Sequence, residues 1–488
     1  MRDSLFHLSR VENASLQAQI REMLVAAILE QRISHGEPLP SSRKMAQSLG
    51  VSRNTVVLTY QALVDDGYLV ARERSGFYVN PEITAETPSP QPARGAADGA
   101  APDWAARFRM RPTAQTVVVK PADWRSYAYP FIYGQVDEDL FAIGAWRECS
   151  RQALGRRGMD AWTGDSRERD DPMLVEQIRT RLLPRRGIYA DANQILITMG
   201  AQNALYLLAS LLTTEATSVA MEEPGYTDAR NIFSLKTRRM SLIPVDGRGL
   251  PIDERLTGAD YIYVTPSHQF PTTVTMPIER RAALLDYAKR HDIVIIEDDY
   301  EAETNYVSDP TPALKSLDKS GRVIYVGSMS KTLFPGLRLG YLVASPELIA
   351  EARALRHLMF RHPPNNNQRT AALFLSLGYH DSLIHRLHRA YRERWRAMAD
   401  ALQAHIPDST RQPTFGGTSF WVEAPSGIDT DDLAARAAKR GVLIEPGTVH
   451  FGGTPRPRNY FRLGFSSIPK AKIEPGIKLL AAVIAEMT

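Results

Sequence analysis

The segment 327–341, with the sequence GSMSKTLFPGLRLGY, combines one lysine with several side chains that bind anions. Lys331 follows an apolar strand-like run, so it is placed to point into a cleft at the edge of a sheet, where a lysine amine can form a Schiff base. Ser328, Ser330 and Arg338 flank it and offer hydroxyl and guanidinium donors to one phosphate group. This pattern favours a reactive lysine beside a phosphate site over a solvated surface ammonium.

An acid and a tyrosine end the apolar run DIVIIEDDY at residues 292–300. A carboxylate at Asp298 would keep the nitrogen of a pyridine ring protonated, and Tyr300, on the same side of an extended chain, would hydrogen-bond a phenolic oxygen of that ring. The drop from four aliphatic residues to three acids indicates a strand that ends in a cleft rather than a solvated loop. Together with Lys331 and its phosphate donors, these residues predict a site for pyridoxal 5′-phosphate.

Three further features match the other needs of such a site, which include an aromatic plate and phosphate donors. Gly200, Ala201 and Gln202 follow the run QILITM and open a helix, and the N–H groups and dipole at a helix start bind phosphate. Tyr226, in EEPGYTDAR, is a candidate for stacking on the ring. Arg462, in NYFRLGF, has apolar and aromatic neighbours, so its charge needs an anion, either a structural carboxylate or the carboxylate of a ligand.

All of these residues lie in a large C-terminal block of the 488-residue chain. Apolar strand-like runs alternate there with helical patterns, which predicts an α/β fold with a largely parallel sheet. Ligands of such sheets sit at the C-terminal ends of the strands, where the candidate residues fall. A stretch rich in Pro, Ala and Gly precedes the block and predicts a linker. We therefore expect three parts, residues 1–80, 81–120 and 121–488.

The first eighty residues predict a winged helix-turn-helix. Apolar residues at helical spacing indicate a first helix within 15–31. Ser41 can cap a second, short helix that Gly50 ends, and Ser52 can cap a third. The stretch 68–80 has two strand-like runs around a Ser-Gly turn, which is typical of a β-hairpin.

The start of the third helix is where such a domain reads base edges, while earlier helix ends and the hairpin hold phosphates or enter the minor groove. Arg can read guanine, Asn can read adenine, and the Thr methyl can pack on thymine. The net charge of +4 is too small to argue for nucleic acid, so the prediction depends on this local pattern. The residues that we expect at a double-stranded DNA operator are Arg43, Ser52, Arg53, Asn54, Thr55, Arg72, Arg74 and Gly76.

Composition excludes several other classes of protein. No apolar run approaches the roughly twenty residues that span a bilayer, and the N-terminus lacks the order of a signal peptide, so we expect a cytoplasmic protein without a membrane partner. The single cysteine, Cys149, excludes an internal disulfide framework and a thiolate zinc cage, and we expect no metal site.

The N-terminal run LPSSRKMAQSLGVSRNTVVLTYQALVDDGYLVARERSGFYV resembles the winged-helix domain of GntR-type bacterial regulators. The block from about Tyr127 onward looks like a fold-type I aminotransferase, through GAQNAL, EEPGY, TPSHQFPTTVTMP, IIEDDY and SMSKTLFPGLRLGY. The whole chain is similar to the MocR/GabR family of pyridoxal phosphate-dependent regulators. The resemblance implies a mostly parallel large domain, a smaller C-terminal α+β subdomain and a head-to-tail homodimer.

On this resemblance, Lys331 carries the internal aldimine of the cofactor. It also implies that Asp298 and Tyr300 bind the cofactor ring, that Tyr226 stacks on it, and that Ser328 and Arg338 bind the phosphate. Arg462 would bind the effector's carboxylate, and His268 would be a further neighbour of the ring. The sequence departs from its relatives at three places. Arg74 and Thr273 stand where many relatives have glycine, and residues 162–178 are more acidic than the Gly-Pro-Leu-Arg stretch usual in relatives.

Two functions fit these parts. The first is a transcriptional regulator in which an amino-group effector exchanges with Lys331, forms an external aldimine and alters operator binding. The second is a working aminotransferase with an appended DNA-binding head. A degenerate domain kept only for dimerisation is a third possibility, against which the intact Lys331, Asp298 and Arg338 argue. We expect a sensor with at most a residual transaminase half-reaction.

The effector stays open at this stage. An anion ligand at Arg462 favours a compound with an amino group and an acidic group, such as an amino acid, a γ-amino acid, taurine or a diamino acid. In some members of the resembling family, pyridoxal phosphate is itself the signal. The sequence does not choose among these compounds, and it does not say whether the protein activates or represses.

Overall fold

The computed structural model describes residues 8, 14–33, 38–73, 75–85, 102–156, 158–161, 163–164, 169–307, 311–407, 409 and 416–488. The chain divides into two compact units, Met1–Arg107 and Phe108–Thr488, which are described separately here. The division falls inside the segment 81–120 that the sequence predicts as a linker. The described parts of that segment include two short helices, α4 (Pro81–Ala85) and α5 (Trp104–Arg107).

The N-terminal unit is the expected winged helix-turn-helix. It contains α1 (Leu16–Leu29), α2 (Ser42–Leu49), α3 (Arg53–Asp65), β1 (Leu69–Arg72) and β2 (Gly76–Val79). Ser52 caps α3 by accepting a hydrogen bond from the Thr55 N–H at 3.1 Å, and Gly50 ends α2 in the left-handed conformation with φ of 65°. Tyr60 is fully buried, and its hydroxyl donates to the Pro40 carbonyl at 2.9 Å, which ties α3 to the turn before α2. These caps and the hairpin confirm the predictions for this block.

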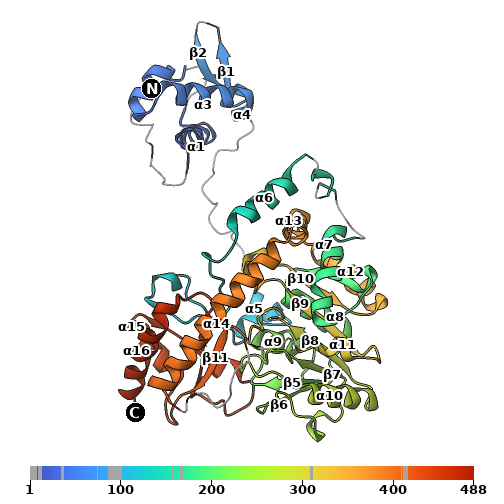
Figure 1. Ribbon diagram of the computed structural model, residues 1–488. Helices are drawn as coiled ribbons and strands as arrows, with labels where there is room; N and C mark the ends of the chain where they lie inside the picture. Colours follow the sequence, from blue (N-terminus) through green and yellow to red (C-terminus); the bar gives the residue numbers. More distant parts are fainter. Residues whose placement is uncertain are drawn as a thin grey trace. The chain divides into compact units, whose positions relative to one another are not determined.

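A seven-stranded sheet forms the centre of the second unit (Figure 1). Its strands, in spatial order, are β4 (Ile195–Thr198), β10 (Gly340–Val343), β9 (Val323–Ser328), β8 (Val294–Asp299), β7 (Tyr261–Val264), β5 (Val219–Glu223) and β6 (Met240–Pro244). The five strands from β9 to β6 are parallel, and β10 runs antiparallel to both of its neighbours. The sheet is therefore mostly parallel, as expected.

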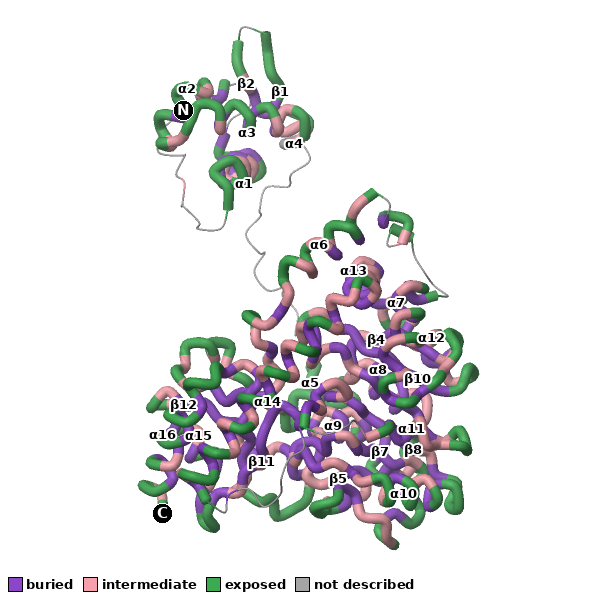
Figure 2. The backbone as a smooth tube through the Cα atoms, viewed as in Figure 1, coloured by how far each residue is buried: buried purple, intermediate pink, exposed green. Residues whose placement is uncertain are grey.

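Helices cover both faces of this sheet, because its strands are apolar on both sides. On one face, Ile262 of β7 packs in a hydrophobic cluster with residues of α10 (Ile278–Arg290). On the other face, the next residue, Tyr263, packs in a hydrophobic cluster with residues of α8 (Ala201–Leu212) and α12 (Pro346–Phe360). Figure 2 shows the strands of the sheet as the buried layer and the helices with exposed outer sides. The loops that follow β8 and β9 therefore begin at the buried sheet, and these loops carry candidate residues.

The smaller C-terminal subdomain has the expected mixed α and β composition. Its three-stranded antiparallel sheet has the order β11 (Ser419–Glu423), β14 (Tyr460–Gly464) and β13 (Glu445–Pro446). A separate parallel pair joins β12 (Val442–Leu443) to β3 (Tyr129–Pro130). The subdomain's helices are α14 (Tyr379–His405), α15 (Thr430–Lys439) and α16 (Ile473–Ala485). This arrangement brings β3, β13 and β14 to the edge of the large sheet.

The other α-helices among the described residues of the second unit are α6 (Ile143–Leu154), α7 (Pro172–Gln177), α9 (Thr227–Ser234), α11 (Leu314–Leu317) and α13 (Asn365–Ser376). Within the described part of the chain, no helix combines the length and the apolar character needed to cross a bilayer. The one cysteine, Cys149, is buried and carries a free thiol.

Candidate functional site

A cavity of about 280 Å³ lies beyond the ends of β8 and β9. Ten of the residues that the sequence singles out line it, from segments more than 250 residues apart along the chain. They are Ala201, Gln202, Tyr226, Asp298, Tyr300, Ser328, Ser330, Lys331, Arg338 and Arg462. The structure therefore brings together most of the site residues predicted from separate motifs.

Lys331 lies inside the cavity beside the ring of Tyr133. Its ammonium nitrogen is 4.2 Å from the centroid of that ring, and a Cβ added at Gly134 would come within 2.9 Å of the same nitrogen. Removal of the ammonium from water lowers the pKa of Lys331 to about 7. A large share of this lysine is thus a neutral amine near neutral pH, which is the nucleophilic form.

Asp298 contributes a buried acceptor to the cavity. Its Oδ2 atom accepts a hydrogen bond from the Tyr263 hydroxyl at 2.8 Å, whereas its Oδ1 atom is buried and has no partner among the described residues. Burial raises the pKa of Asp298 to about 7. The site thus holds an acid whose ionised form needs a cation, and the protonated nitrogen of a pyridine ring is such a cation.

An anion cradle lies at the start of α8. Gly200 is the residue before this helix and has φ of 80°, and a Cβ added there would be 3.1 Å from the Nη2 atom of Arg338. The same Arg338 nitrogen donates to the Met199 carbonyl at 3.1 Å. Ser328 and Ser330 line the cavity nearby. A helix N-terminus, a guanidinium and two hydroxyls suit a phosphate group.

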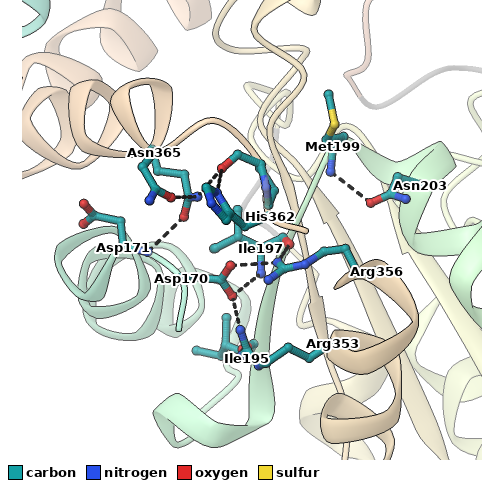
Figure 3. A network of polar contacts seen from close by, with 12 residues as sticks. Asp170, Asp171, Ile195, Ile197, Met199, Asn203, Arg353, Arg356, His362 and Asn365 are labelled. Atoms are coloured by element: carbon teal, nitrogen blue, oxygen red, sulfur yellow. Dashed lines mark hydrogen bonds and ion pairs between the residues drawn. The ribbon is translucent and has the colours of Figure 1, made fainter. Parts of the chain in front are cut away.

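A buried ion network holds the strand that leads into this cradle (Figure 3). Asp170 is completely buried and pairs with Arg353 at 2.8 Å and with Arg356 at 2.7 Å. The carboxylate also accepts from the N–H of Ile197 in β4 at 3.2 Å. The acidic stretch that departs from the family pattern therefore fixes the edge of the sheet just before Gly200.

Aromatic side chains close one side of the cavity. The ring of Phe270 lies between Tyr226 and Tyr300, with centroid distances of 5.1 Å and 5.6 Å and edge-on geometry in both pairs. Burial raises the pKa of both tyrosines, so their hydroxyls stay protonated and can donate. Tyr226 donates to Asp228 at 3.3 Å. This group supplies an aromatic surface for a flat ligand and phenolic donors at its rim.

Arg462 is buried and forms an ion pair with Glu445, so a structural carboxylate already holds one side of the guanidinium. The register of β13 and β14 places the two residues directly opposite each other. Burial alone would raise the pKa of Glu445. The charge of Arg462 and the hydrogen bond from His450 instead bring this pKa down to about 2. The Nε atom of Arg462 is buried without a partner among the described residues.

His268 does not line this cavity, although it is buried. A Cβ added at Gly416 would lie 3.3 Å from its ring, and one at Gly417 would lie 3.8 Å from its Nδ1 atom. Thr273, which stands where relatives have glycine, has φ of 62° and so occupies the left-handed conformation that glycine favours.

Sequence reasoning missed eight residues that line the cavity, and Lys120, Tyr133, Gly134 and Phe270 are among them. Lys120 falls at the end of the segment whose composition predicts a linker, which concealed it. Tyr133 and Gly134 follow the two-residue strand β3, which is too short for a recognisable pattern. Phe270 lies inside the quoted motif TPSHQFPTTVTMP, so that motif could have identified it.

In the N-terminal unit, Arg43, Arg53, Asn54 and Arg72 are exposed, as DNA contacts must be. Arg53 opens α3, and its Nε atom donates to the Ser42 hydroxyl at 3.4 Å. Arg72 packs over the ring of Tyr78 at 4.4 Å. Arg74 lies outside the described residues. These four side chains thus meet the exposure that the prediction requires, and Thr55 is partly exposed.

Two family profiles match the chain. "Bacterial regulatory proteins, gntR family" matches residues 16–79, and "Aminotransferase class I and II" matches residues 169–480. The chain is 45% identical to the HTH-type transcriptional regulator TauR of Rhodobacter capsulatus, with 98% of each chain covered. It is 32% identical to the probable rhizopine catabolism regulatory protein MocR of Rhizobium meliloti, covering 97% of this chain and 94% of that one.

The chain belongs to the MocR family of GntR-type regulators. Like other proteins of this family, it is a DNA-binding transcriptional regulator with an aminotransferase-like domain. That domain is also similar to the crystal structure of LysN, the α-aminoadipate aminotransferase of Thermus thermophilus, complexed with N-(5′-phosphopyridoxyl)-L-leucine. The TM-score is 0.71 and the identity 27%, over 79% of this chain and 98% of that one. The MocR family and the aminotransferase fold that the sequence predicts are both confirmed.

Proposed function

We propose that this MocR-family regulator holds pyridoxal 5′-phosphate in the cavity around Lys331 and senses an amino compound with it. The observation that carries the proposal is the pairing of a partly neutral lysine with a buried acid that has one unpartnered oxygen in the same cavity. A purely structural domain has no need of either group, because each costs folding free energy.

The residues present fit the cofactor. Arg338, Gly200 and Ser328 would hold its phosphate, and Asp298 would bind its ring nitrogen. Tyr226 would stack on the ring, and Tyr300 would donate to the phenolic oxygen. When bound, the cofactor supplies an aldehyde carbon that can carry one amine at a time.

The chain's own residues then decide which amine is attached. Lys331 would hold the cofactor in the absence of an effector, and an effector's amino group would compete with the lysine amine for the same carbon. Arg462 attracts the effector's acidic group, and the buried surroundings strengthen that attraction. Effectors of this kind are amino acids, taurine and diamino acids. A free lysine amine and an occupied arginine would change the contacts around the cavity, and this change would shift the placement of the DNA-binding heads.

We further propose that the protein acts in the cytoplasm as a head-to-tail homodimer, so that two heads read paired half-sites in an operator. Ile143 and Leu154 of α6 support this, since these apolar residues are 47% and 51% exposed. Arg43, Arg53, Asn54, Thr55 and Arg72 would then make the DNA contacts, α3 entering the major groove.

A second candidate is an active aminotransferase with an appended head, which the likeness to LysN favours. An absorbance titration of the purified chain with a panel of amino compounds separates the two. In parallel, the affinity of the chain for an operator selected from random DNA is measured. For a sensor, one compound shifts the cofactor's absorbance, changes operator affinity and yields no steady keto product. Steady conversion with an added keto acid and unchanged operator affinity would identify an enzyme.

A further inference from the structure

The C-terminal end of the segment 81–120 packs against the cavity. Val118 and Lys120 line it together with the predicted site residues. The segment is anchored on α9, because Gln115 donates to the Asn231 carbonyl at 3.1 Å and the Asn231 amide donates to the Thr116 carbonyl at 2.8 Å. The chain that leads toward the DNA-binding head therefore begins in the wall of the effector cavity.

The ammonium group of Lys120 points toward Lys331. Lys120 is exposed as a residue, yet its Nζ atom donates to the Tyr133 carbonyl at 2.6 Å. A Cβ added at Gly134 would lie 3.3 Å from this nitrogen and 2.9 Å from the Nζ atom of Lys331. The two lysines thus approach the same point from different elements, and a Cβ at residue 134 would make their amino ends shift.

Lys120 belongs to the Arg462 end of the cavity and not to the phosphate cradle. The ring of Tyr133 has three basic groups around it: Arg462 at 3.8 Å, Lys331 at 4.2 Å and Lys120 at 5.5 Å from its centroid. Arg338 instead lies against Gly200 at the start of α8. Loss of water contact lowers the pKa of Lys120, while Glu445 and Asp228 oppose this lowering and Arg462 adds to it.

Three acids, Glu445, Glu301 and Asp228, act on the basic groups here, but they do not occupy every N–H donor. Glu445 pairs with the Nη2 atom of Arg462 and leaves the buried Nε atom without a partner among the described residues. An ammonium has three N–H donors, of which the Tyr133 carbonyl accepts one. Donors on Arg462 and Lys120 are therefore available to one additional anion between them.

We propose that Lys120 is the second ligand, with Arg462, of the effector's acidic group, and that it thereby ties the end of the linker to the bound effector. This inference rests on the proposed function. It narrows the effector to a short compound with an amino group at one end and a carboxylate or sulfonate at the other. A simple amine would engage only the Lys331 end of the cavity.

The test uses the full-length, cofactor-loaded chain with Lys120→Met, which removes the charge and keeps an unbranched side chain, and with Lys120→Arg. Lys236→Met is the matched control, because Lys236 lies over the ring of Tyr206 and is not among the cavity residues. Binding of taurine, β-alanine and ethylamine is followed by the cofactor's absorbance. Ethylamine has the amino end of the other two compounds without the acid.

Lys120→Met should weaken the binding of taurine and β-alanine about tenfold or more, as expected for loss of a charge-assisted hydrogen bond, and leave ethylamine binding unchanged. Lys120→Arg should keep most of the affinity, and Lys236→Met should match the wild type. In the wild type, taurine or β-alanine should also slow hydrogen exchange in residues 115–120, whereas ethylamine should not.

Equal affinity of Lys120→Met and the wild type for both acids would overturn this inference and leave the proposed function intact. Equal weakening for ethylamine would do the same, because Lys120 would then act on the amine end. A wild-type protein whose absorbance responds to none of the three compounds would instead contradict sensing of short amino acids, and both proposals would fall for this class of effector.

Discussion

Replacement of Asp298 by asparagine should change stability and cofactor binding in opposite directions. Burial raises the pKa of Asp298 from its ordinary value of 3.8 to about 7. Between pH 4 and pH 7 the folded carboxyl stays protonated while the unfolded one ionises, so this group makes folding less favourable as the pH rises. At about 1.36 kcal/mol for each tenfold change in proton affinity, the ionised carboxylate costs about 4 kcal/mol above pH 7.

Asparagine removes that cost and can still accept from Tyr263 through its carbonyl. The apoprotein of Asp298→Asn should therefore resist urea better than the wild type at pH 8, by up to about 4 kcal/mol, and the advantage should disappear near pH 4. Its affinity for pyridoxal phosphate should fall about tenfold or more, because a neutral amide cannot pair with a protonated ring nitrogen.

Asp299→Asn is the matched control. Asp299 is the next residue and equally buried, but it pairs with Arg186 at 2.8 Å and accepts from the Tyr325 hydroxyl at 2.9 Å. Its replacement leaves a buried arginine unpaired and should cost about 3–5 kcal/mol. The reasoning is refuted if Asp298→Asn destabilises the apoprotein at pH 8 as Asp299→Asn does, or if it binds the cofactor as tightly as the wild type.

Three other predictions follow from single contacts. Attachment of pyridoxal phosphate to the apoprotein should rise with pH around a midpoint near 7, since the neutral form of Lys331 reacts; a midpoint near 10.5 in stopped-flow absorbance would contradict this. Glu445→Gln should lower the urea midpoint of unfolding, because Arg462 loses its buried partner. An acidic effector should then stabilise this variant more than it stabilises the wild type. Equal stabilisation of the two proteins would count against Arg462 as a ligand of the effector's acidic group. Ser52→Ala should cost about 1 kcal/mol in the calorimetric unfolding of the head, and Ser52→Asp, which can still cap α3, should not; equal losses would show that the cap is not the cause.

The elements that the sequence predicts well are those set by local chemistry. Ser52 and Gly50 bound their helices because a side-chain acceptor and a left-handed glycine satisfy helix ends regardless of the rest of the fold. The cluster around Lys331 and Asp298 was also predictable, since the ends of neighbouring parallel strands meet at one edge of a sheet.

The contacts that the sequence does not predict join distant segments. Arg462 meets Glu445 only through the register of β13 with β14, and β13 has two residues, so it leaves no periodic signal. Lys120 enters the cavity because the linker's end is anchored on α9, which its composition cannot reveal. His268 belongs to a motif that contributes Phe270 to the cavity, but it does not line the cavity itself, because the direction of a loop side chain is set by tertiary packing.

The central claim is that the cavity around Lys331 reports its ligand to the DNA-binding head. The most direct test is reciprocal: the operator affinity of the cofactor-loaded chain is measured with and without a saturating effector, and the effector affinity with and without operator. Linkage requires that both ratios be equal and different from one, and Lys331→Ala should reduce both to one. Ratios of one in the wild type, with an effector that still binds, would contradict the claim.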